Sequence, residues 1–495
     1  MKKYLKYLYI FLFPALISGC DSEFLNLTNP DAFDINKYYK SEQDMDDALT
    51  AAYDATRSYY NWMFFATEMK SDNATTFDAG TASGLYYTFV SHQVTSNNTI
   101  VSNIWNGLYN TIYKSNLVLK YIDGVSMSDD SRARITAEAK FLRALSHFYL
   151  IRLYGPVPVL DKLVETTTQA RAVTRQPLTD AYALIISDLE EVANSTVLPV
   201  FYEGTSPNFG RVTRTAGAAL LGKVYLTMAA TMDQNSYYTD AVTYLTNAIN
   251  LKGYNDFPSG ATFPKVFGTA NENNEEIIFQ CMYLSNVSEY SPFAQYFQPQ
   301  GQSGLTSQSI GRGFNAGQEN LFLEFETGDR RTSTTILKTP TGAYYTKKYV
   351  DLSSSTGYGG NNWIEIRFAD VFLMLAEAYE RLQMPTEAKE YLDKVRVRAS
   401  VPKYDLASVD YHTKYPTLRA AIFHERRMEL AFENHRWFDL QRLYPNSDDF
   451  VAHMTSVVEP SVGNKYSAFE AYETLLPIPY DEVFLNKNLY QNDQY

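Results

Sequence analysis

Cysteine and histidine are scarce in this chain, and their scarcity limits the chemistry available to it. The 495 residues include two cysteines and six histidines, and none of them falls in an H-x-x-x-H or C-x-x-C spacing. Zinc and iron–sulfur sites depend on such clusters, so we expect no metal site and no cofactor. The many Asp and Asn side chains leave the question of a structural Ca²⁺ ion open.

An excess of positive charge and a long internal apolar run are also missing. The formal net charge is −13, and so acidic a surface argues against a protein that follows nucleic-acid phosphates. After the amino terminus, no segment is long and apolar enough to cross a bilayer of roughly 30 Å as a helix. A chain of this length can bury a large core, divided by length alone among about two to four domain-sized units.

The amino terminus has the order of a secretory signal. Basic residues precede an apolar stretch at 7–17, and small residues follow it. The run ISGC that ends at Cys20 resembles a bacterial lipobox, in which the cysteine thiol receives a diacylglycerol. We expect residues 1–19 to be removed and Cys20 to carry the lipid that holds the protein to a membrane. A stray cysteine beside a cleaved signal is the alternative.

Acylation of Cys20 has a consequence for the second cysteine. Only Cys281 then keeps a thiol, so we expect no intrachain disulfide. Asp21 and Glu23, directly after the lipobox, resemble the acidic surface-export signal of lipoproteins in bacteria of the Bacteroidetes type.

Helical periodicity dominates the rest of the chain. Apolar residues recur at helical spacing over 41–59, with Ser41 as the cap, and long helices are predicted over 100–122 and 131–154. A G-P-V-P run directly after residue 154 ends the last of these helices. The polar residues 71–102, which carry several aromatic side chains, are predicted to form a loop.

Two later stretches, beginning at Leu220 and Val371, resemble each other. The second has small and aromatic residues at the offsets of a tetratricopeptide repeat, and the first has them if about seven extra residues near 233–238 lengthen its turn. These residues are Gly222, Tyr225, Ala241 and Ala248 in the first stretch and Ala376, Tyr379, Ala388 and Val395 in the second. Small residues let two helices approach closely, and the aromatic ring fills the groove above them. The predicted fold is mainly α, a tetratricopeptide-like helical-repeat scaffold.

A turn-dense region interrupts these helices at residues 251–362. It is rich in Gly, Ser, Asn, Phe and Tyr, with short strands predicted at 276–282 and 344–350. An irregular insertion of this length in a helical protein is usually a set of functional loops.

The last quarter of the chain carries the most specific motifs. HERRMELAFENHRWFDLQRL begins at His424, and LLPIPYDEVFLNKNLYQNDQY closes the chain. In this order they resemble the SusD/RagB family of outer-membrane nutrient-binding lipoproteins, and the lipobox and the repeats extend the resemblance over most of the chain. The residues that form the charged motif are Glu425, Arg426, Arg427, Glu429, Glu433, Arg436 and Asp439.

The resemblance implies four segments and has three departures. We expect a signal peptide at 1–19, an N-terminal helical region with ligand-facing loops at 20–250, the loop-rich insertion at 251–362, and a C-terminal region at 363–495 that completes the scaffold. The departures are Asn434 for a usual Gly, Lys487 for a usual Pro, and Asp493-Gln494 for Pro-Gly. Asn tolerates the left-handed backbone better than most residues, so a sharp turn is still expected there.

The charged motif has a structural and a catalytic interpretation. Paired arginines and carboxylates can fix how helices and loops dock. Glu429 and Glu433, one helical turn apart, could alternatively act as an acid and base pair, but arginines around them would keep both ionised. We favour the structural interpretation.

The resemblance also implies a function. Family members are lipid-anchored at the outer-membrane surface and act as the lid of a TonB-dependent, SusC-like β-barrel, which takes up the oligosaccharide, or in some members the peptide, that the lid captures. The candidate ligand contacts, chosen by region, are Trp62, Phe77, Asp78, Tyr86, Tyr87, Tyr290, Tyr296, Phe297 and Arg312. Trp363 is expected to pack in the core. A surface hydrolase and a structural or adhesive repeat protein are the alternatives.

Overall fold

The fold is that of a computed structural model, which describes residues 38–76, 83–286, 288–299, 311–352, 359–459, 463–464, 466 and 468–495. The expected signal peptide and Cys20 lie outside these residues. None of the helices in the described ranges is long and apolar enough to cross a membrane.

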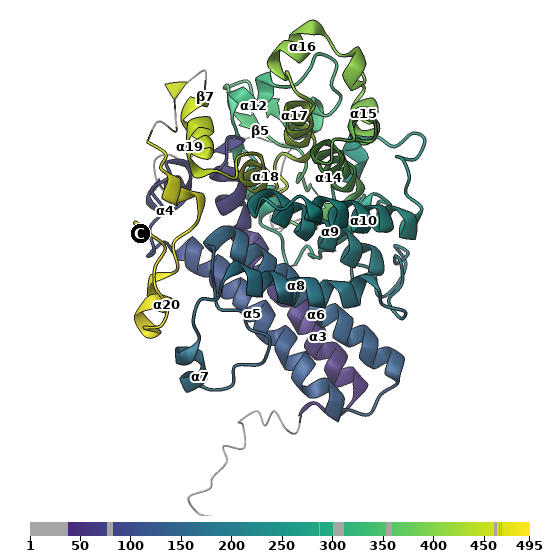
Figure 1. The fold of residues 1–495 in the computed structure, drawn as a ribbon, viewed down its shortest axis with the longest axis vertical. Helices are drawn as coiled ribbons and strands as arrows, with labels where there is room; N and C mark the ends of the chain where they lie inside the picture. Colours follow the sequence, from purple (N-terminus) through teal and green to yellow (C-terminus); the bar gives the residue numbers. More distant parts are fainter. Residues whose placement is uncertain are drawn as a thin grey trace, which may run out of the picture.

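Helices that pack one against the next form the frame of the molecule (Figure 1). The frame helices are α3 (Glu42–Phe64), α5 (Thr99–Tyr121), α6 (Asp129–Tyr154), α8 (Leu178–Ala193), α9 (Arg214–Thr231), α10 (Ser236–Lys252), α14 (Phe368–Arg381), α15 (Pro385–Ala399) and α17 (Leu418–Leu430). α3 packs on α5, α5 on α6, α6 on α8, α8 on α9 and α9 on α10; α10 then contacts α14, which packs on α15 and α17. The prediction of a mainly helical, tetratricopeptide-like scaffold is confirmed.

Shorter helices decorate this frame. They are α4 (Ser83–Val90), α7 (Thr167–Ala172), α11 (Phe293–Phe297), α12 (Glu319–Leu323), α13 (Thr332–Thr335), α16 (Val409–Lys414), α18 (Arg436–Leu443), α19 (Ser447–Ser456) and α20 (Tyr480–Leu485). α4 corrects the prediction that residues 71–102 form a loop, because Tyr86, Tyr87 and Phe89 lie on this helix.

The three long N-terminal helices begin within two residues of their predicted starts, and α5 and α6 also end where the sequence predicts, but α3 runs five residues beyond the predicted end at residue 59. The Ser41 side chain accepts a hydrogen bond from the Asp44 N–H, and the Asp44 carboxylate accepts one from the Ser41 N–H, so α3 starts in a reciprocal capping box. α6 ends at Gly155, whose φ of 74° is a left-handed value that favours glycine.

The two repeat-like stretches form the helix pairs α9–α10 and α14–α15. A Cβ atom on Gly222 would lie 2.6 Å from the Leu245 side chain, so the absence of a side chain permits the close approach of α9 and α10. The predicted aromatic residues cover the grooves: Tyr225 stacks on Tyr244 at 5.6 Å, and Tyr379 stacks on Tyr391 at 5.8 Å.

The extra residues of the first pair do not lie where the sequence predicted them. The connections between the helices, residues 232–235 and 382–384, are almost equally long. Most of the added residues lengthen the helices, because further helical turns gain hydrogen bonds and packing that a longer loop would not.

Short antiparallel strands form three small sheets, two of which join the insertion to segments outside it. They are β1 (Ala74–Thr75), β2 (Ile277–Cys281), β3 (Ala316–Gly317), β4 (Leu337–Lys338), β5 (Tyr344–Tyr345), β6 (Trp363–Arg367), β7 (Val458–Glu459) and β8 (Gly463–Asn464). The sheets have the orders β1-β3-β5-β4, β2-β6 and β7-β8. β2 confirms the first predicted strand, whereas β5 covers only the start of the second. Trp363 is fully buried and stacks on Tyr349 at 5.2 Å, as expected of a core residue.

We predict that Gly222→Ala destabilises the protein by about 1–3 kcal/mol, because the new methyl group overlaps Leu245 between two packed helices. Urea unfolding followed by circular dichroism measures the effect. Gly84→Ala on α4 is the matched control, because a Cβ atom there has no neighbour within 4 Å. Equal stabilities of the two variants would contradict the close-packing account.

Candidate functional site

α3 passes directly into a π-helical turn, η2 (Phe65–Met69), at the edge of the candidate site. A π turn is wider than an α turn, so it changes the direction in which the following side chains point. Trp62, in the last turn of α3, is partly exposed, whereas Phe65 is fully buried. Turns of this kind are frequent at functional sites.

Three predicted contact residues from distant segments meet in one aromatic cluster around this turn. Trp62 stacks near Phe65 with a centroid distance of 6.2 Å, and Phe65 stacks on Tyr86 of α4 at 5.1 Å. Tyr86 and Tyr296 of α11 both contact Phe314, at 4.5 Å and 5.1 Å. We call these five residues the aromatic cluster. The cluster joins the end of the first helix to the insertion.

The outer edge of the aromatic cluster is polar and accessible. Trp62, Tyr86 and Tyr296 are each partly exposed, and Arg312 is exposed. Burial, with contributions from Tyr86 and Tyr290, raises the pKa of Tyr296 to about 12, although Arg312 opposes the shift. Tyr296 is therefore a neutral phenol that can donate or accept a hydrogen bond at neutral pH.

Backbone hydrogen bonds hold the Arg312 segment against α11. The Arg312 N–H donates to the Gln295 carbonyl at 2.8 Å, and the Asn315 N–H donates to the Tyr296 carbonyl at 3.1 Å. A Cβ atom on Gly311 would lie 2.5 Å from the Pro299 carbonyl oxygen, so this approach requires glycine. Arg312 and Tyr296 are therefore held side by side by backbone contacts.

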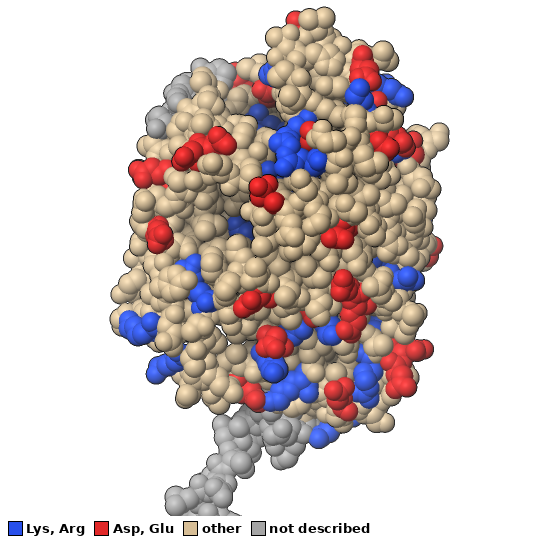
Figure 2. All heavy atoms as spheres, viewed as in Figure 1, with Lys and Arg blue, Asp and Glu red and all other residues tan. Residues whose placement is uncertain are grey.

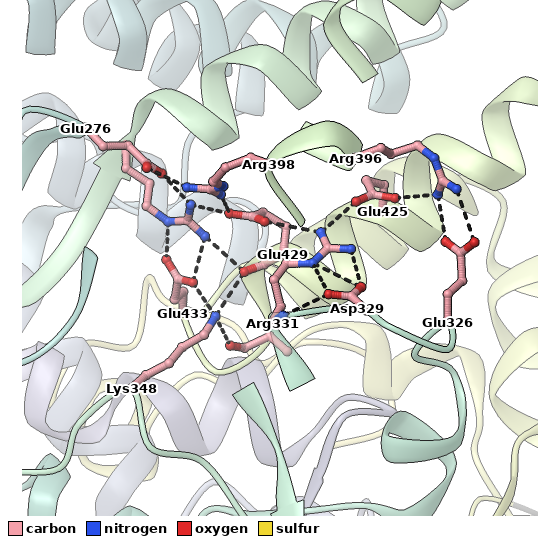
Figure 3. A network of polar contacts seen from close by, with 12 residues as sticks. Glu276, Glu326, Asp329, Arg331, Lys348, Arg396, Arg398, Glu425, Glu429 and Glu433 are labelled. Carbon is pink, nitrogen blue, oxygen red and sulfur yellow. Dashed lines mark hydrogen bonds and ion pairs between the residues drawn. The ribbon is translucent and has the colours of Figure 1, made fainter. Parts of the chain in front are cut away.

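The charged motif begins on α17, and three of its carboxylates, Glu425, Glu429 and Glu433, are buried in a second cluster, which is polar (Figure 3). Arg367 Nη1 lies 2.5 Å from Glu429 and 2.7 Å from Glu276. Arg367 Nε lies 2.7 Å from Glu433, which also pairs with Lys348 at 2.5 Å. Glu433 is thus shared between two cations, and Arg367 among three carboxylates.

The same network continues along the helix toward the opposite end of Figure 3. Arg331 Nη1 lies 2.6 Å from Glu425 and 3.2 Å from Glu429. Arg396 joins Glu425 at 2.9 Å and Glu326 at 2.9 Å. The network therefore ties the insertion, α15 and α17 together.

Comparison with known proteins agrees with this architecture. A family model described as the SusD family matches residues 315–495, and a second, described as starch-binding associating with outer membrane, matches residues 23–226.

The chain belongs to the SusD family.

Its SusD relatives cover most of its length. SusD-like protein P2 of Formosa agariphila is 25% identical over 531 residues, which span 100% of this chain and 99% of the relative. A SusD-like protein of Bacteroides ovatus is 24% identical over 479 residues, which span 86% of this chain and 80% of the relative.

Solved SusD structures share the fold. A laminarin-binding SusD-like protein is 24% identical with a TM-score of 0.75, and the match covers 92% of this chain and 100% of the other. Surface glycan-binding protein A from Bacteroides thetaiotaomicron, in complex with laminarihexaose, is 20% identical with a TM-score of 0.76 over the same shares of the two chains.

The other predicted contact residues of this SusD-family chain fall into three groups. Tyr87 on α4 is 43% exposed, and Tyr290 is partly exposed beside Tyr296. The prediction that Phe297 contacts the ligand is wrong, because its side chain is fully buried. Its ring packs against Phe64 and Tyr349, at centroid distances of 4.9 Å and 5.0 Å. The remaining two, Phe77 and Asp78, lie outside the described residues.

Two members of the aromatic cluster are not among the residues that the sequence predicts. Phe65 lies three residues after Trp62, which is the spacing of neighbours on a helix, so periodicity holds a signal for it. Phe314 joins Tyr86 to Tyr296 only through the tertiary fold, and no local pattern marks it.

Glu429 and Glu433 of the charged motif are poorly suited to act as an acid and base pair. Burial alone would raise the pKa of Glu429, but the guanidinium groups of Arg398 and Arg367 outweigh it and hold that pKa well below its usual range. The pKa of Glu433 is likewise lowered, by Arg367 and Lys348 against the effect of burial. Both therefore stay ionised, and neither can serve as a proton donor near neutral pH.

The rest of the motif connects α17 to the π turn and to α14. Arg436 holds both carboxylate oxygens of Asp72, at 2.6 and 2.7 Å, and Arg427 donates to the Asn73 side chain at 2.8 Å. Arg426 lies 2.9 Å from both Asp370 and Asp439. The motif thus fixes the segment directly after η2, on which the aromatic cluster depends.

Asn434 makes the turn that its left-handed tolerance predicts. Its φ is 63°, and its N–H donates to Glu68 Oε1 at 2.8 Å. The Thr67 hydroxyl donates to its side-chain oxygen at 2.7 Å. Asn434 therefore binds η2 through its side chain, which a glycine could not do.

The described residues offer neither the usual cluster of three metal ligands nor a reactive thiol. No three His, Cys, Asp or Glu side chains are grouped to hold a metal ion in the described ranges. Burial raises the pKa of Cys281 to about 12, which keeps its thiol protonated and unreactive.

We predict that Glu429→Gln costs about 3–5 kcal/mol of stability near neutral pH, because it leaves buried guanidinium groups without their counter-charge. Since the folded-state pKa of Glu429 is lowered, its contribution is complete above the ordinary value of 4.5 and is lost as pH falls below it. The variant should therefore lose less stability than the wild type between about pH 6 and about pH 3.

Urea unfolding at the two pH values measures both effects. Glu390→Gln is the control: its side chain is 64% exposed and pairs with Lys394 on the same helix, so we expect a change within about 0.5 kcal/mol. A Glu429→Gln variant as stable as this control would contradict the structural role of the network.

Proposed function

We propose that this protein captures glycans at the bacterial cell surface and binds them at the outer edge of the aromatic cluster. The observation that carries the proposal is that Trp62, Tyr86 and Tyr296, which come from three separate segments, meet in one cluster and are each partly exposed. Ring faces stack on the C–H faces of sugars, while phenols and the Arg312 guanidinium bind hydroxyl groups.

Relatives and surface charge support a neutral glycan as the ligand. Two solved SusD-family structures are a laminarin-binding protein and a complex with laminarihexaose. Figure 2 shows basic and acidic side chains interspersed over the face viewed, a pattern that offers no broad field for a polyanion.

The protein is proposed to act as a lid for a SusC-like, TonB-dependent β-barrel in the outer membrane, held there by lipid on Cys20. The lipobox at Cys20 and the family model for association with the outer membrane support this assignment. A rigid helical frame suits a lid, because a lid must move as one body while its ligand surface keeps its shape.

We propose further that the protein binds its ligand without cleaving it. The candidate acid–base pair, Glu429 and Glu433, is buried and held ionised by arginine and lysine side chains. The alternative is a lid that binds peptides, which differs from the proposed protein only in its ligand. A binding screen that includes both glycans and peptides separates the two.

We predict saturable binding of at least one polysaccharide by the chain from Asp21 onward, expressed without lipid, and no new reducing ends. Calorimetry with laminarin, starch, xylan, mannan and casein peptides tests this. Trp62→Ala and Tyr86→Ala should each weaken binding at least about ten-fold, because each removes a stacking face. Phe484→Ala, an aromatic side chain that is 57% exposed on α20, should leave binding unchanged.

Three results would overturn parts of this proposal. Binding of peptides alone would replace the ligand class, and release of reducing ends would make the protein an enzyme. Glycan binding that survives both aromatic substitutions would move the site elsewhere.

We also predict that Cys20→Ser moves the protein from the membrane to the soluble fraction, because no acyl chain can then be attached. Metabolic labelling with a radioactive fatty acid measures the attachment directly. Label on the Cys20→Ser variant would contradict the assignment.

A further inference from the structure

A small polar cavity of about 10 Å³ is lined by residues of the insertion and of β6. The polar part of its lining is formed by Glu272, Gln280, Lys348, Asn361 and Asn362. A space of this size holds one water molecule or one metal ion, but no organic ligand. The charges and hydrogen bonds of the lining therefore decide what occupies it.

Two carboxamide side chains beside the cavity lack hydrogen-bond partners among the described residues. Asn361 is 3% exposed, and both its Oδ1 and its Nδ2 atom are unpaired. Gln280 is also 3% exposed, and its Nε2 donates to the Glu272 carbonyl at 2.8 Å, but its Oε1 is unpaired. Unpaired buried polar atoms are rare in folded proteins, so these two oxygens require an explanation.

Two carboxylates bind the backbone on either side of Asn361. Glu272 accepts a hydrogen bond from the Asn362 N–H at 2.8 Å. Asp351, which is 3% exposed, accepts one from the Gly360 N–H at 2.7 Å. Burial raises the pKa of Glu272 to about 7, and the charge of Asp351 adds to this effect, although the Asn362 N–H opposes it. Within the described ranges, no lysine, arginine or histidine forms an ion pair with Glu272.

Lys348 lines the same cavity but does not supply the missing positive charge. Its ammonium group has three N–H donors. They go to Glu433 Oε1 at 2.5 Å and to the carbonyls of Glu429 and Ala431 at 3.0 and 2.8 Å. No donor is left for Glu272, and Lys348 is not among the groups that lower the pKa of that carboxyl.

This set of ligand atoms fits a hard cation. It consists of carboxylate and carboxamide oxygens, without the nitrogen or sulfur atoms that zinc prefers. Ca²⁺ binds about six to eight such oxygens at roughly 2.3–2.6 Å, which is closer than a water molecule approaches them. Mg²⁺ keeps several of its water molecules, and a cavity of about 10 Å³ has no room for them.

We propose that the cavity is a Ca²⁺ site, in which Glu272 and the side-chain oxygens of Asn361 and Gln280 bind the ion. Asp351 adds negative charge beside it. The ion joins separate segments of the insertion to the residues directly before β6, and so braces the base of the insertion. Affinity rises with the number of charged ligands, and only two carboxylates lie here, so we expect a Kd on the order of 10⁻⁴–10⁻³ M. The site does not depend on the proposed glycan-binding function.

Terbium luminescence of the soluble chain from Asp21 onward tests the proposal. Tb³⁺ binds to the same oxygen ligands as Ca²⁺, and it emits when an aromatic ring nearby absorbs light and passes the energy on. Tyr349 lines the cavity and stacks on Trp363 at 5.2 Å, so these rings lie close enough to sensitise the ion. We expect sensitised emission that CaCl₂ displaces with a Kd on the order of 10⁻⁴–10⁻³ M, and that MgCl₂ displaces at least about ten-fold less well.

Substitutions at the cavity give effects of opposite sign. Glu272→Gln should weaken calcium binding at least about ten-fold, because it removes a charge but keeps an oxygen for the Asn362 N–H. Glu275→Gln is the matched control, because Glu275 is exposed on the same loop, and calcium binding should not change. Asn361→Asp should tighten binding about ten-fold, because a carboxylate of the same shape replaces the amide. This gain decides the matter even if Glu272→Gln fails to fold.

Thermal unfolding gives an independent measurement. The unfolding midpoint of the wild type should rise with CaCl₂ at constant ionic strength, because the ion binds only the folded chain, and that of Glu272→Gln should not. The calcium site is refuted if neither the emission nor the midpoint of the wild type responds to CaCl₂. An equal loss of binding in Glu275→Gln, or a crystal grown in CaCl₂ that shows only water between Glu272 and Asn361, also refutes it.

Discussion

The structure depends on a buried network of arginines and carboxylates around α17. Glu425, Glu429 and Glu433 point inward at one-turn spacing, and each meets cations from other segments. Burying these charges is costly, and only near-complete pairing offsets the cost. The segments that supply the partners must therefore all be in place before the network is satisfied. This requirement links the insertion, α15 and α17 in one arrangement.

The network also explains how a rigid frame can present a variable ligand surface. Arg436 and Asn434 fix the chain around η2, and the aromatic cluster begins at that turn. The rings themselves come from α3, α4 and the insertion, whose outer residues can change without breaking an ion pair. Frame and ligand surfaces are thus physically distinct.

Local sequence patterns predict the features that local forces decide. The Ser41 cap is enough to predict the start of the first helix, and the small residue at Gly222 predicts one close helix pair. Helix α4 is not predictable in this way, because its Ser83-Gly84 start and polar flanks have the composition of a loop. Neighbours Tyr296 and Phe297 cannot be separated either, since which one faces outward depends on the packing of Phe64 and Phe314 from elsewhere in the chain.

The most direct test of the account is a crystal structure of the chain with a bound oligosaccharide from the screen. The account predicts sugar density against Tyr86 and Tyr296, with every ion pair of Glu429 and Glu433 intact. Sugar density over those two carboxylates, or a ligand bound only to surfaces away from the aromatic cluster, would contradict it.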